Sequence, residues 1–354
     1  MAPYLDERPF SSPQDYCFRK KPSHYLSSTS WTAKSFNDES AYTYVLTEAE
    51  IHEVNEALVY FNESGLSIDE ANQFNFPLPT LGKALRALAL EIHEGKGFFV
   101  LRGLNPDKYT IEDNTTDDGT MFGHVCNPDT LAVSQESRPL KYSNRASTFH
   151  NDLYCDIIAL QSRSCAQDGG NHLLVSASKV YEELQRINQQ MADRLFEPDW
   201  PLDLRRRFSS SETRPLFFRH GTHLISSVIP DALIGSPDIE RQPSLVLLTP
   251  TQRETLSTLQ SLCRKHAIAL PMKKGDLLFV NNFALLHARD EFRDSPIQKR
   301  YLVRLWLKND RLSWDLPEVM KSGNEAVFRD VVEKVWNYIP EDKFRFAVYE
   351  RQSP

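Results

Sequence analysis

Apolar residues recur at helical spacing in two segments of the first hundred residues. Residues 46–65 place apolar side chains on one helical face, and Thr47 with Glu50 has the spacing of a capping box. Residues 80–97 show the same period and end at glycines, which commonly follow a helix C-terminus. The pattern therefore predicts a helix in each segment.

From residue 97 onward the pattern changes to short apolar runs that end at polar residues or glycine, as is typical of buried strands. The strands expected from these runs are 97–104, 131–135, 171–177, 214–220, 223–229, 276–282 and 300–307. Further helices are expected at 178–196, 251–266 and 324–337. Many short strands with inserted helices favour an α+β protein built around an antiparallel β-sandwich or barrel.

The sequence contains no internal repeat and no linker with a change of composition on both sides. Residues 1–45 are rich in Ser, Pro and Tyr without periodicity, and we expect an extended arm there. A single domain is expected over 46–354, with its core at about 90–310 and a helical tail at 311–354.

Composition and charge narrow the class of protein. The net charge of −7 argues against a nucleic-acid partner, because phosphate binding normally needs clustered basic residues. No apolar run reaches the roughly 18–20 residues of a membrane helix, so no membrane partner is expected. The five cysteines are scattered without a C-x-x-C pair, which suits a reducing compartment. The N-terminus lacks a secretory signal, and a cytoplasmic location is expected.

The stretch TFHNDLYCD (148–156) contains the first candidate chemistry. On a strand, His150 and Asp152 would point to the same side and could serve as two neighbouring metal ligands. A mononuclear Fe(II) centre needs a second histidine to complete such a set. The motif alone is weak, because one accidental H-x-D among ten histidines is about an even chance. A polar turn in a buried sheet is the alternative reading.

The second half of the chain supplies candidate partners. His287 comes just after an apolar strand, and Arg300 and Arg304 lie four residues apart in the next apolar run, hence on one expected strand face. Arginine suits planar carboxylates, and a buried arginine normally has an anionic partner. The pair therefore indicates one or two bound acid groups, with structural ion pairs as the alternative.

Taken together with QDGGNHLLVSASKVYEEL (167–184) and GDLLFVNN (275–282), these features resemble the taurine dioxygenase/TfdA family, which is grouped with clavaminate synthase. The resemblance covers about residues 90–310. It implies a double-stranded β-helix, or jelly-roll, core with flanking and inserted helices. It also implies an Fe(II)- and 2-oxoglutarate-dependent dioxygenase that uses O₂ and releases succinate and CO₂.

The resemblance also implies roles for individual residues. His150, Asp152 and His287 would be the iron ligands. Arg300 would bind the distal carboxylate of 2-oxoglutarate, and Arg304 would hold an acidic group of the primary substrate. The family usually has a threonine after the Gly-Gly turn that helps with the 2-oxoglutarate carboxylate. In this chain His172 stands there, either as a co-substrate contact or as a satisfied core histidine.

The arm and the tail resemble fungal secondary-metabolism members of the family, some of which oxidise small amino acids, including by closing an aziridine ring on valine. The expected substrate is therefore a small carboxylate-bearing molecule, foremost an amino acid, that is hydroxylated or cyclised at an unactivated C–H. Phe344 and Phe346 in the tail are candidates to close over it. Asn282 is expected to orient the backbone near His287, and a homo-oligomer is left open.

Three other classes of protein are alternatives to this interpretation. A hydrolase lacks support, since the sequence has neither G-x-S-x-G nor H-E-x-x-H. An iron protein of the same fold that does not use 2-oxoglutarate is a second alternative. A third is a catalytically inactive jelly-roll protein that binds a carboxylate ligand or a protein partner. An inactive protein would be expected to have lost a ligand residue, and none of the three is missing.

Overall fold

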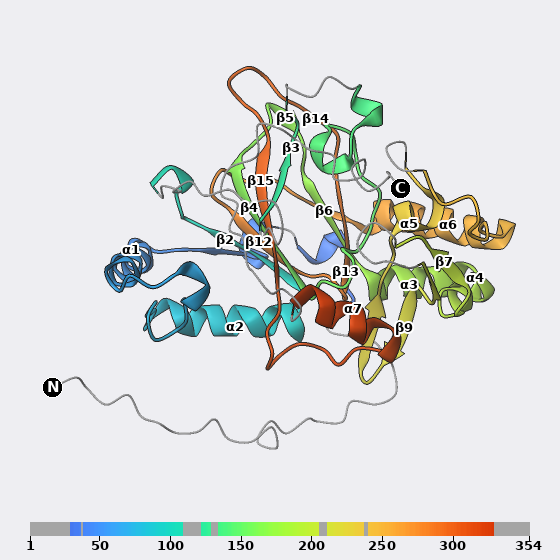
Figure 1. Ribbon diagram of the computed structural model, residues 1–354, viewed down its shortest axis with the longest axis horizontal. Coiled ribbons are helices and arrows are strands. Elements are labelled where there is room, and N and C mark those ends of the chain that lie inside the picture. Colours follow the sequence, from blue (N-terminus) through green and yellow to red (C-terminus); the bar gives the residue numbers. More distant parts are fainter. Residues whose placement is uncertain are drawn as a thin grey trace, which may run out of the picture.

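The computed structural model describes residues 29–36, 38–108, 122–128, 134–204, 211–236 and 240–328. Its largest sheet has six strands in the order β1-β2-β12-β4-β15-β3 (Figure 1), and every pair is antiparallel except β1 with β2. The strands are β1 (Thr43–Val45), β2 (Phe98–Arg102), β3 (Gly123–Cys126), β4 (Ile157–Ser164), β12 (Leu277–Asn281) and β15 (Tyr301–Leu307).

A second, three-stranded antiparallel sheet has the order β11-β6-β13. Its strands are β11 (Ile268–Leu270), β6 (His172–Ser176) and β13 (Leu285–Arg289). Three short pairs complete the β-structure: β5 (Asp168–Gly169) with β14 (Phe292–Arg293), β7 (Trp200–Leu202) with β8 (Glu212–Arg214), and β9 (Phe217–His220) with β10 (His223–Ser226).

Both faces of the six-stranded sheet are covered at β2, which explains why this strand reads as a continuous apolar run. In β2, Phe98 and Val100 belong to the main core, whereas Phe99 and Leu101 join a second cluster under α1 (Glu48–Glu63) and α2 (Leu81–His93). These two helices lie on one side of the strands (Figure 1).

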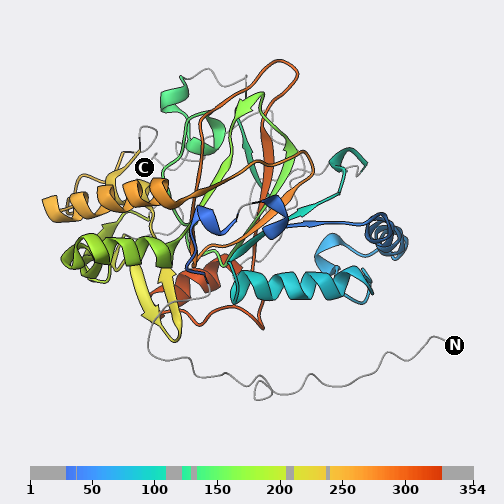
Figure 2. The same ribbon diagram turned by 180° about the vertical axis from the view of Figure 1, so that it is seen from behind.

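On the opposite side lie α3 (Ala177–Ile187), α4 (Gln189–Arg194) and α6 (Pro250–His266), which pack against one another (Figure 2). Two further helices, α5 (Pro230–Ile234) and α7 (Glu318–Phe328), follow β10 and β15. Short 3₁₀ helices occupy Ala33–Ser35, Glu39–Ala41, Ile68–Glu70, Pro106–Lys108, Gln135–Ser137 and Leu140–Tyr142. No described helix is both long and apolar enough to cross a membrane.

Local sequence signals account for most helix boundaries. The expected helices at 46–65 and 80–97 are confirmed as α1 and α2, and the capping box forms: Glu50 N–H donates to Thr47 Oγ1 over 3.2 Å. The single helix expected over 178–196 is wrong. It breaks at Asn188, whose side chain accepts from the backbone of the next turn and begins α4.

Three further expectations need correction. The strand expected at 214–220 is interrupted at Pro215, which has no N–H for the sheet, so β8 ends before it and β9 begins after it. In the strand expected at 131–135, residue 135 instead begins a 3₁₀ helix, and residues 131–133 lie outside the described part. The last helix begins at Glu318, directly after Pro317, and residues 329–337 are not described.

The described part of the expected arm contacts the domain. Trp31 and Tyr42 are buried in the main core, and β1 extends the six-stranded sheet beside β2. The proposed domain limits, 1–45 and 46–354, stay a prediction.

Candidate metal centre and adjoining pocket

His150 and His287 are neighbours across an isolated antiparallel bridge. The N–H of each residue donates to the carbonyl oxygen of the other, over 2.9 Å and 3.0 Å. The prediction that the H-x-D motif lies on a strand is wrong, because the chain turns away after this bridge and residues 151–156 form no strand. His287 does not follow a strand either; it lies in the middle of β13.

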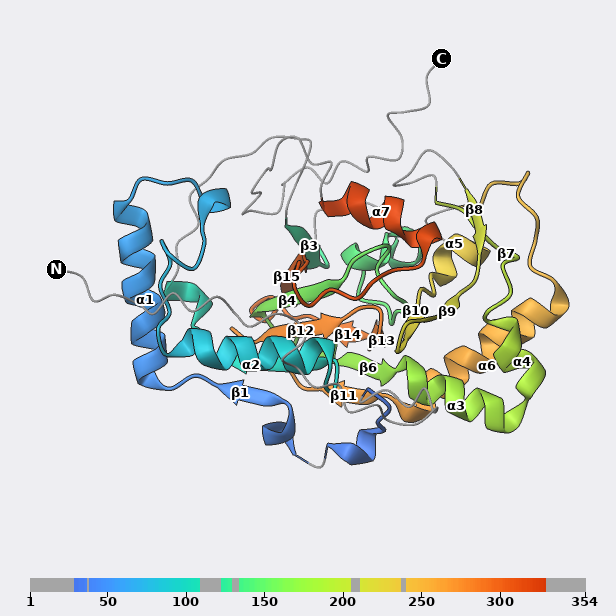
Figure 3. The ribbon, with the colours of Figure 1, turned by 90° about the horizontal axis from the view of Figure 1, so that it is seen from below.

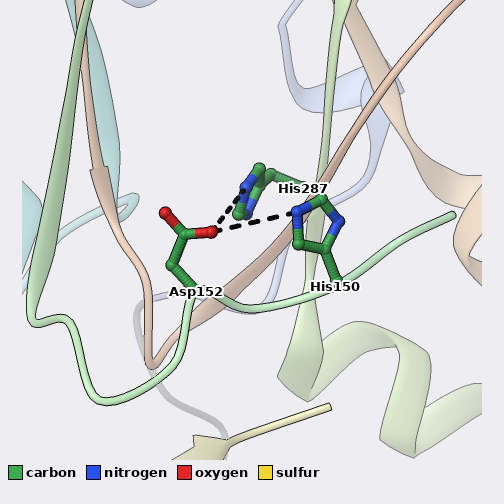
Figure 4. A group of neighbouring side chains, drawn as sticks. All are labelled: His150, Asp152 and His287. Atoms are coloured by element: carbon green, nitrogen blue, oxygen red, sulfur yellow. Dashed lines mark ion pairs between the residues drawn. The ribbon is translucent and has the colours of Figure 1, made fainter. Parts of the chain in front are cut away.

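The three predicted ligands nevertheless converge. One ligand atom from each of His150, Asp152 and His287 can be chosen so that all three lie within 4.8 Å of one another. Nε2 of each histidine is 3.9 Å from Oδ1 of Asp152 (Figure 4). Among the described residues, this is the one cluster of three or more His, Cys, Asp or Glu side chains that could hold a metal ion.

The donor chemistry suits a divalent ion. Nδ1 of His150 is 2.8 Å from the carbonyl oxygen of Thr148, and donating its proton there leaves the Nε2 lone pair free for a metal. Burial lowers the pKa of His287 to about 3, with His150 and Arg304 acting in the same direction and Asp152 opposing them. His287 is therefore a neutral imidazole at physiological pH, the form that ligates metals.

The two oxygens of Asp152 have different surroundings. Oδ1 faces the histidines, whereas Oδ2 accepts hydrogen bonds from Arg304 Nη1 over 2.9 Å and Trp306 Nε1 over 2.7 Å. Arg304 and Trp306 are two residues apart on β15, so both side chains project toward the carboxylate. Trp306 was not predicted from the sequence, although residues two apart on a strand point to the same face and Trp306 follows Arg304 by two.

The loop that carries Asp152 is held by two buried asparagines. The Asp152 N–H donates to Oδ1 of Asn282 over 2.7 Å, and Nδ2 of Asn282 donates to the carbonyl oxygens of Asp152 and Cys155, each over 2.7 Å. Asn151 accepts from the N–H of Val228 over 2.7 Å. Asn282 thus orients the Asp152 backbone. No role for Asn151 was predicted from the sequence.

Arg300 and His172 line one pocket, together with residues that include Gly170, Ser162 and Leu302. Arg300 is only 4% exposed, and its Nε donates to the carbonyl oxygen of Gly170 over 3.2 Å. Its Nη1 and the Nε2 of His172 have no hydrogen-bond partner among the described residues. Two buried polar nitrogens without partners indicate a place where a ligand completes the hydrogen bonding.

The charges in this pocket suit an anion. Burial lowers the pKa of Arg300 to about 9, with Arg289 acting in the same direction, so the guanidinium stays protonated at neutral pH. Burial and the neighbouring Arg300 hold the pKa of His172 well below its usual range, which keeps the imidazole neutral. A buried cation beside a neutral donor is an arrangement that binds a carboxylate.

The family model for the taurine catabolism dioxygenase TauD, TfdA family matches residues 63–306. The chain belongs to this family. The predictions of the family and of its enzyme class, a non-haem Fe(II)- and 2-oxoglutarate-dependent dioxygenase, are confirmed.

Two relatives of this TauD/TfdA member cover most of its length. The taurine hydroxylase-like protein SAT17 of Stachybotrys chartarum is 31% identical over 88% of this chain and 87% of its own. The FR-33289 synthase of Streptomyces rubellomurinus is 23% identical over 78% of this chain and 88% of its own. The first of these is a fungal protein, in line with the expected resemblance to fungal members.

Solved structures confirm the fold. An asparagine oxygenase in complex with Fe(II), 3-hydroxyasparagine and succinate matches with a TM-score of 0.56 and 16% identity, over 75% of this chain and 93% of that one. The non-haem iron oxygenase OrfP, in complex with Fe and α-ketoglutaric acid, matches with a TM-score of 0.55 and 16% identity, over 76% and 94%. The expected α+β class with a jelly-roll core is therefore confirmed.

In this TauD/TfdA member the two arginines of the predicted pair have separate surroundings. Arg300 precedes β15, whose register with β4 shifts between Tyr301 and Leu302, and it lines the pocket, whereas Arg304 contacts Asp152. Phe344 and Phe346 lie outside the described residues. The histidines at the β9–β10 turn lie apart from any described metal cluster: His220 pairs with Asp315 over 2.8 Å, and His223 stacks on Trp314.

Proposed function

We propose that this dioxygenase oxidises an unactivated C–H bond of an amino acid or another small carboxylic acid, with Fe(II), 2-oxoglutarate and O₂. The observation that carries the proposal is the convergence of Nε2 of His150, Nε2 of His287 and Oδ1 of Asp152. Two imidazoles and one carboxylate are the ligand set of a non-haem Fe(II) centre with open positions.

In this proposal, His150, Asp152 and His287 hold the iron. Bound iron supplies the activation of O₂, coupled to the conversion of 2-oxoglutarate to succinate and CO₂. The protein contributes the geometry: the bridge between His150 and His287 fixes the imidazoles, and Arg304 with Trp306 occupies Oδ2 of Asp152. A carboxylate held in this way offers a single oxygen to the metal and leaves room for co-substrates.

Arg300 and His172 bind the distal carboxylate of 2-oxoglutarate in the proposed enzyme. Support comes from their shared pocket, the unpartnered Nη1 and Nε2, and the retained charge of Arg300. In this account His172 takes the place that a threonine usually has in the family.

Arg304 is proposed to hold the acidic group of the primary substrate with the donors that do not contact Asp152, since a guanidinium has five N–H groups. The choice of an amino acid is supported by the structural neighbours, one of which binds 3-hydroxyasparagine and another (3S)-hydroxy-L-Arg. Aziridine formation on valine is one form of this proposal, and Phe344 and Phe346 are proposed to close over the substrate.

A cytoplasmic location is also part of the proposal. It is supported by Cys126, Cys155, Cys165 and Cys263, which form no disulfide in the described part of the chain and so suit a reducing compartment. The inactive jelly-roll alternative finds no support in a site whose ligand set is complete.

The experiment that tests the proposal measures succinate release by the iron-loaded enzyme against a panel of amino acids and other small carboxylic acids. At least one amino acid should raise succinate well above the rate without substrate. Mass spectrometry of the product then separates hydroxylation, a gain of one oxygen atom, from cyclisation or desaturation, a loss of two hydrogens. The proposed substrate class would be contradicted if no compound of the panel raised succinate release by the iron-loaded enzyme above the rate without substrate.

A further inference from the structure

The helix α7 (Figure 3) lies beyond the family-matched region, which ends at residue 306. It nevertheless packs on the loop that carries Asp152. Two neighbouring residues of α7, Gly323 and Asn324, make the contact, and both are buried. They touch Tyr154 and Asp156, which follow Asp152 by two and four residues.

Tyr154 adopts a backbone conformation that needs support from its surroundings. Its φ of 58° lies in the left-handed region, and no other non-glycine residue in the described part has a positive φ. A bulky residue persists there only where neighbouring groups hold it. The side chain is 1% exposed, and its hydroxyl donates to Glu212 over 2.6 Å.

Gly323 brings the backbone of α7 against the Tyr154 ring. A Cβ at position 323 would lie 2.3 Å from Cε2 and 2.4 Å from Cδ2 of that ring, too close for any side chain. The absence of a side chain at Gly323 therefore lets the helix close over Tyr154.

Asn324 ties the same helix to the loop by hydrogen bonds. Its Nδ2 donates to the carbonyl oxygen of Tyr154 over 2.8 Å and to Oδ1 of Asp156 over 2.5 Å. Its Oδ1 accepts from Nζ of Lys308. With Asn282 bonded to the backbone of Asp152 and Cys155, the loop lies between two asparagines from distant parts of the chain.

We propose that Gly323 and Asn324 are positioning residues for the iron site, and this inference rests on the proposed function of the triad. Asp152 is the one ligand of the three without a place in a β-bridge, so its location depends on the conformation of residues 152–156. α7 holds Tyr154 in its left-handed conformation and thereby keeps Oδ1 of Asp152 facing the two imidazoles. Iron binding and α7 docking then strengthen one another by the same factor.

The first test compares Fe(II) affinity under anaerobic conditions in wild type, Asn324→Leu and Gly323→Ala. Asn324→Leu removes the hydrogen bonds with little change of size, and Gly323→Ala pushes on the Tyr154 ring. Each should weaken Fe(II) binding about tenfold or more, the effect typical of groups that orient metal ligands. Lys321→Ala, a change at a partly exposed position of the same helix, is the matched control and should leave the affinity within about twofold.

The second test needs no variant. Hydrogen exchange of the wild-type protein, with and without Fe(II), should show slower exchange for amides of α7 in the iron-bound protein and unchanged exchange in α1, which packs on the second hydrophobic cluster with Phe99 and Leu101. The positioning role would be overturned if both variants bound Fe(II) as tightly as the wild type. It would also be overturned if Fe(II) left the hydrogen-exchange rates of the α7 amides unchanged. A wild-type protein that binds no iron would instead overturn the proposed function.

Discussion

The indole Nε1 of Trp306 donates a 2.7 Å hydrogen bond to Oδ2 of Asp152. With the 2.9 Å bond from Arg304 Nη1, it satisfies the oxygen of Asp152 that faces away from the two histidines. The other oxygen, Oδ1, lies 3.9 Å from Nε2 of each histidine and is the proposed metal ligand. A tryptophan on β15 thus takes part in shaping a site whose proposed iron ligands come from the 148–156 segment and β13.

Trp306→Phe should weaken Fe(II) binding by about tenfold to a hundredfold, because the ring keeps its packing but Oδ2 of Asp152 loses the hydrogen bond from the indole N–H. Equilibrium titration with Fe(II) under anaerobic conditions measures the change. The melting temperature of the metal-free variant is the control for folding. An unchanged affinity would contradict a role for the Trp306 hydrogen bond in holding the carboxylate.

Arg300→Leu should raise the Kd for 2-oxoglutarate by about a hundredfold, since hydrogen bonds to charged groups are worth roughly 1.5–3 kcal/mol each. The guanidinium is buried, and its Nη1 has no hydrogen-bond partner in the described part of the chain, which leaves it for the ligand. Titration of the iron-loaded variant with 2-oxoglutarate gives the Kd. Fe(II) binding in the absence of 2-oxoglutarate should be retained, and a loss of iron as well would argue against a specific role.

His172→Leu should raise the same Kd by about tenfold, a smaller effect because a neutral donor contributes less than a charged one. His172→Thr should restore most of the affinity if the imidazole only supplies a hydrogen-bond donor. If His172 is merely a core histidine, both variants will bind 2-oxoglutarate as the wild type does.

Gly170→Ala should weaken 2-oxoglutarate binding without affecting iron. A Cβ at this position would lie 2.9 Å from Cδ and 3.0 Å from Nε of Arg300, so the arginine must shift. Gly221→Ala is the matched control: Gly221 also has a positive φ, 57° against 73°, but a Cβ there meets nothing within 4 Å. Equal effects of the two alanines on the Kd would contradict the steric explanation.

His93 should make the free energy of unfolding depend on pH between about 6.5 and 4. Burial lowers its pKa to about 4. In that window the unfolded chain binds a proton that the folded chain does not, so the free energy of unfolding falls as the pH falls. In urea unfolding of the metal-free protein, the free energy of unfolding of His93→Leu should depend on pH less steeply than that of the wild type, by up to about 1.4 kcal/mol per pH unit. His52→Leu, which removes an exposed histidine, is the control; a wild-type slope in His93→Leu would contradict the prediction.

The helices with clear caps and the identities of the candidate ligands could be predicted from the sequence. The H-x-D motif, His287 and the arginines could be found because rare polar residues interrupt apolar runs. Their geometry was predicted less well: His150 forms an isolated bridge, and Asp152 lies in a turn. Such details depend on pairing between segments more than a hundred residues apart, which local periodicity does not encode.

The supporting residues were harder to predict for the same reason. Trp306, Asn151 and Asn324 look like ordinary strand, loop and helix residues in the sequence, and only the fold brings them to Asp152 or its loop. The strand β4 was also missed, because its apolar run, Ile157–Leu160, is only four residues long and continues into a polar stretch.

The proposed function requires that His150, Asp152 and His287 hold one Fe(II) ion beside a 2-oxoglutarate site. The most direct measurement is an anaerobic titration of the metal-free protein with Fe(II) in the presence of 2-oxoglutarate, followed by visible absorption. A metal-to-ligand charge-transfer absorption band should saturate at one iron per chain in the wild type and should be absent in Asp152→Ala. No band in the wild type, or an equally strong band in Asp152→Ala, would contradict the proposed function.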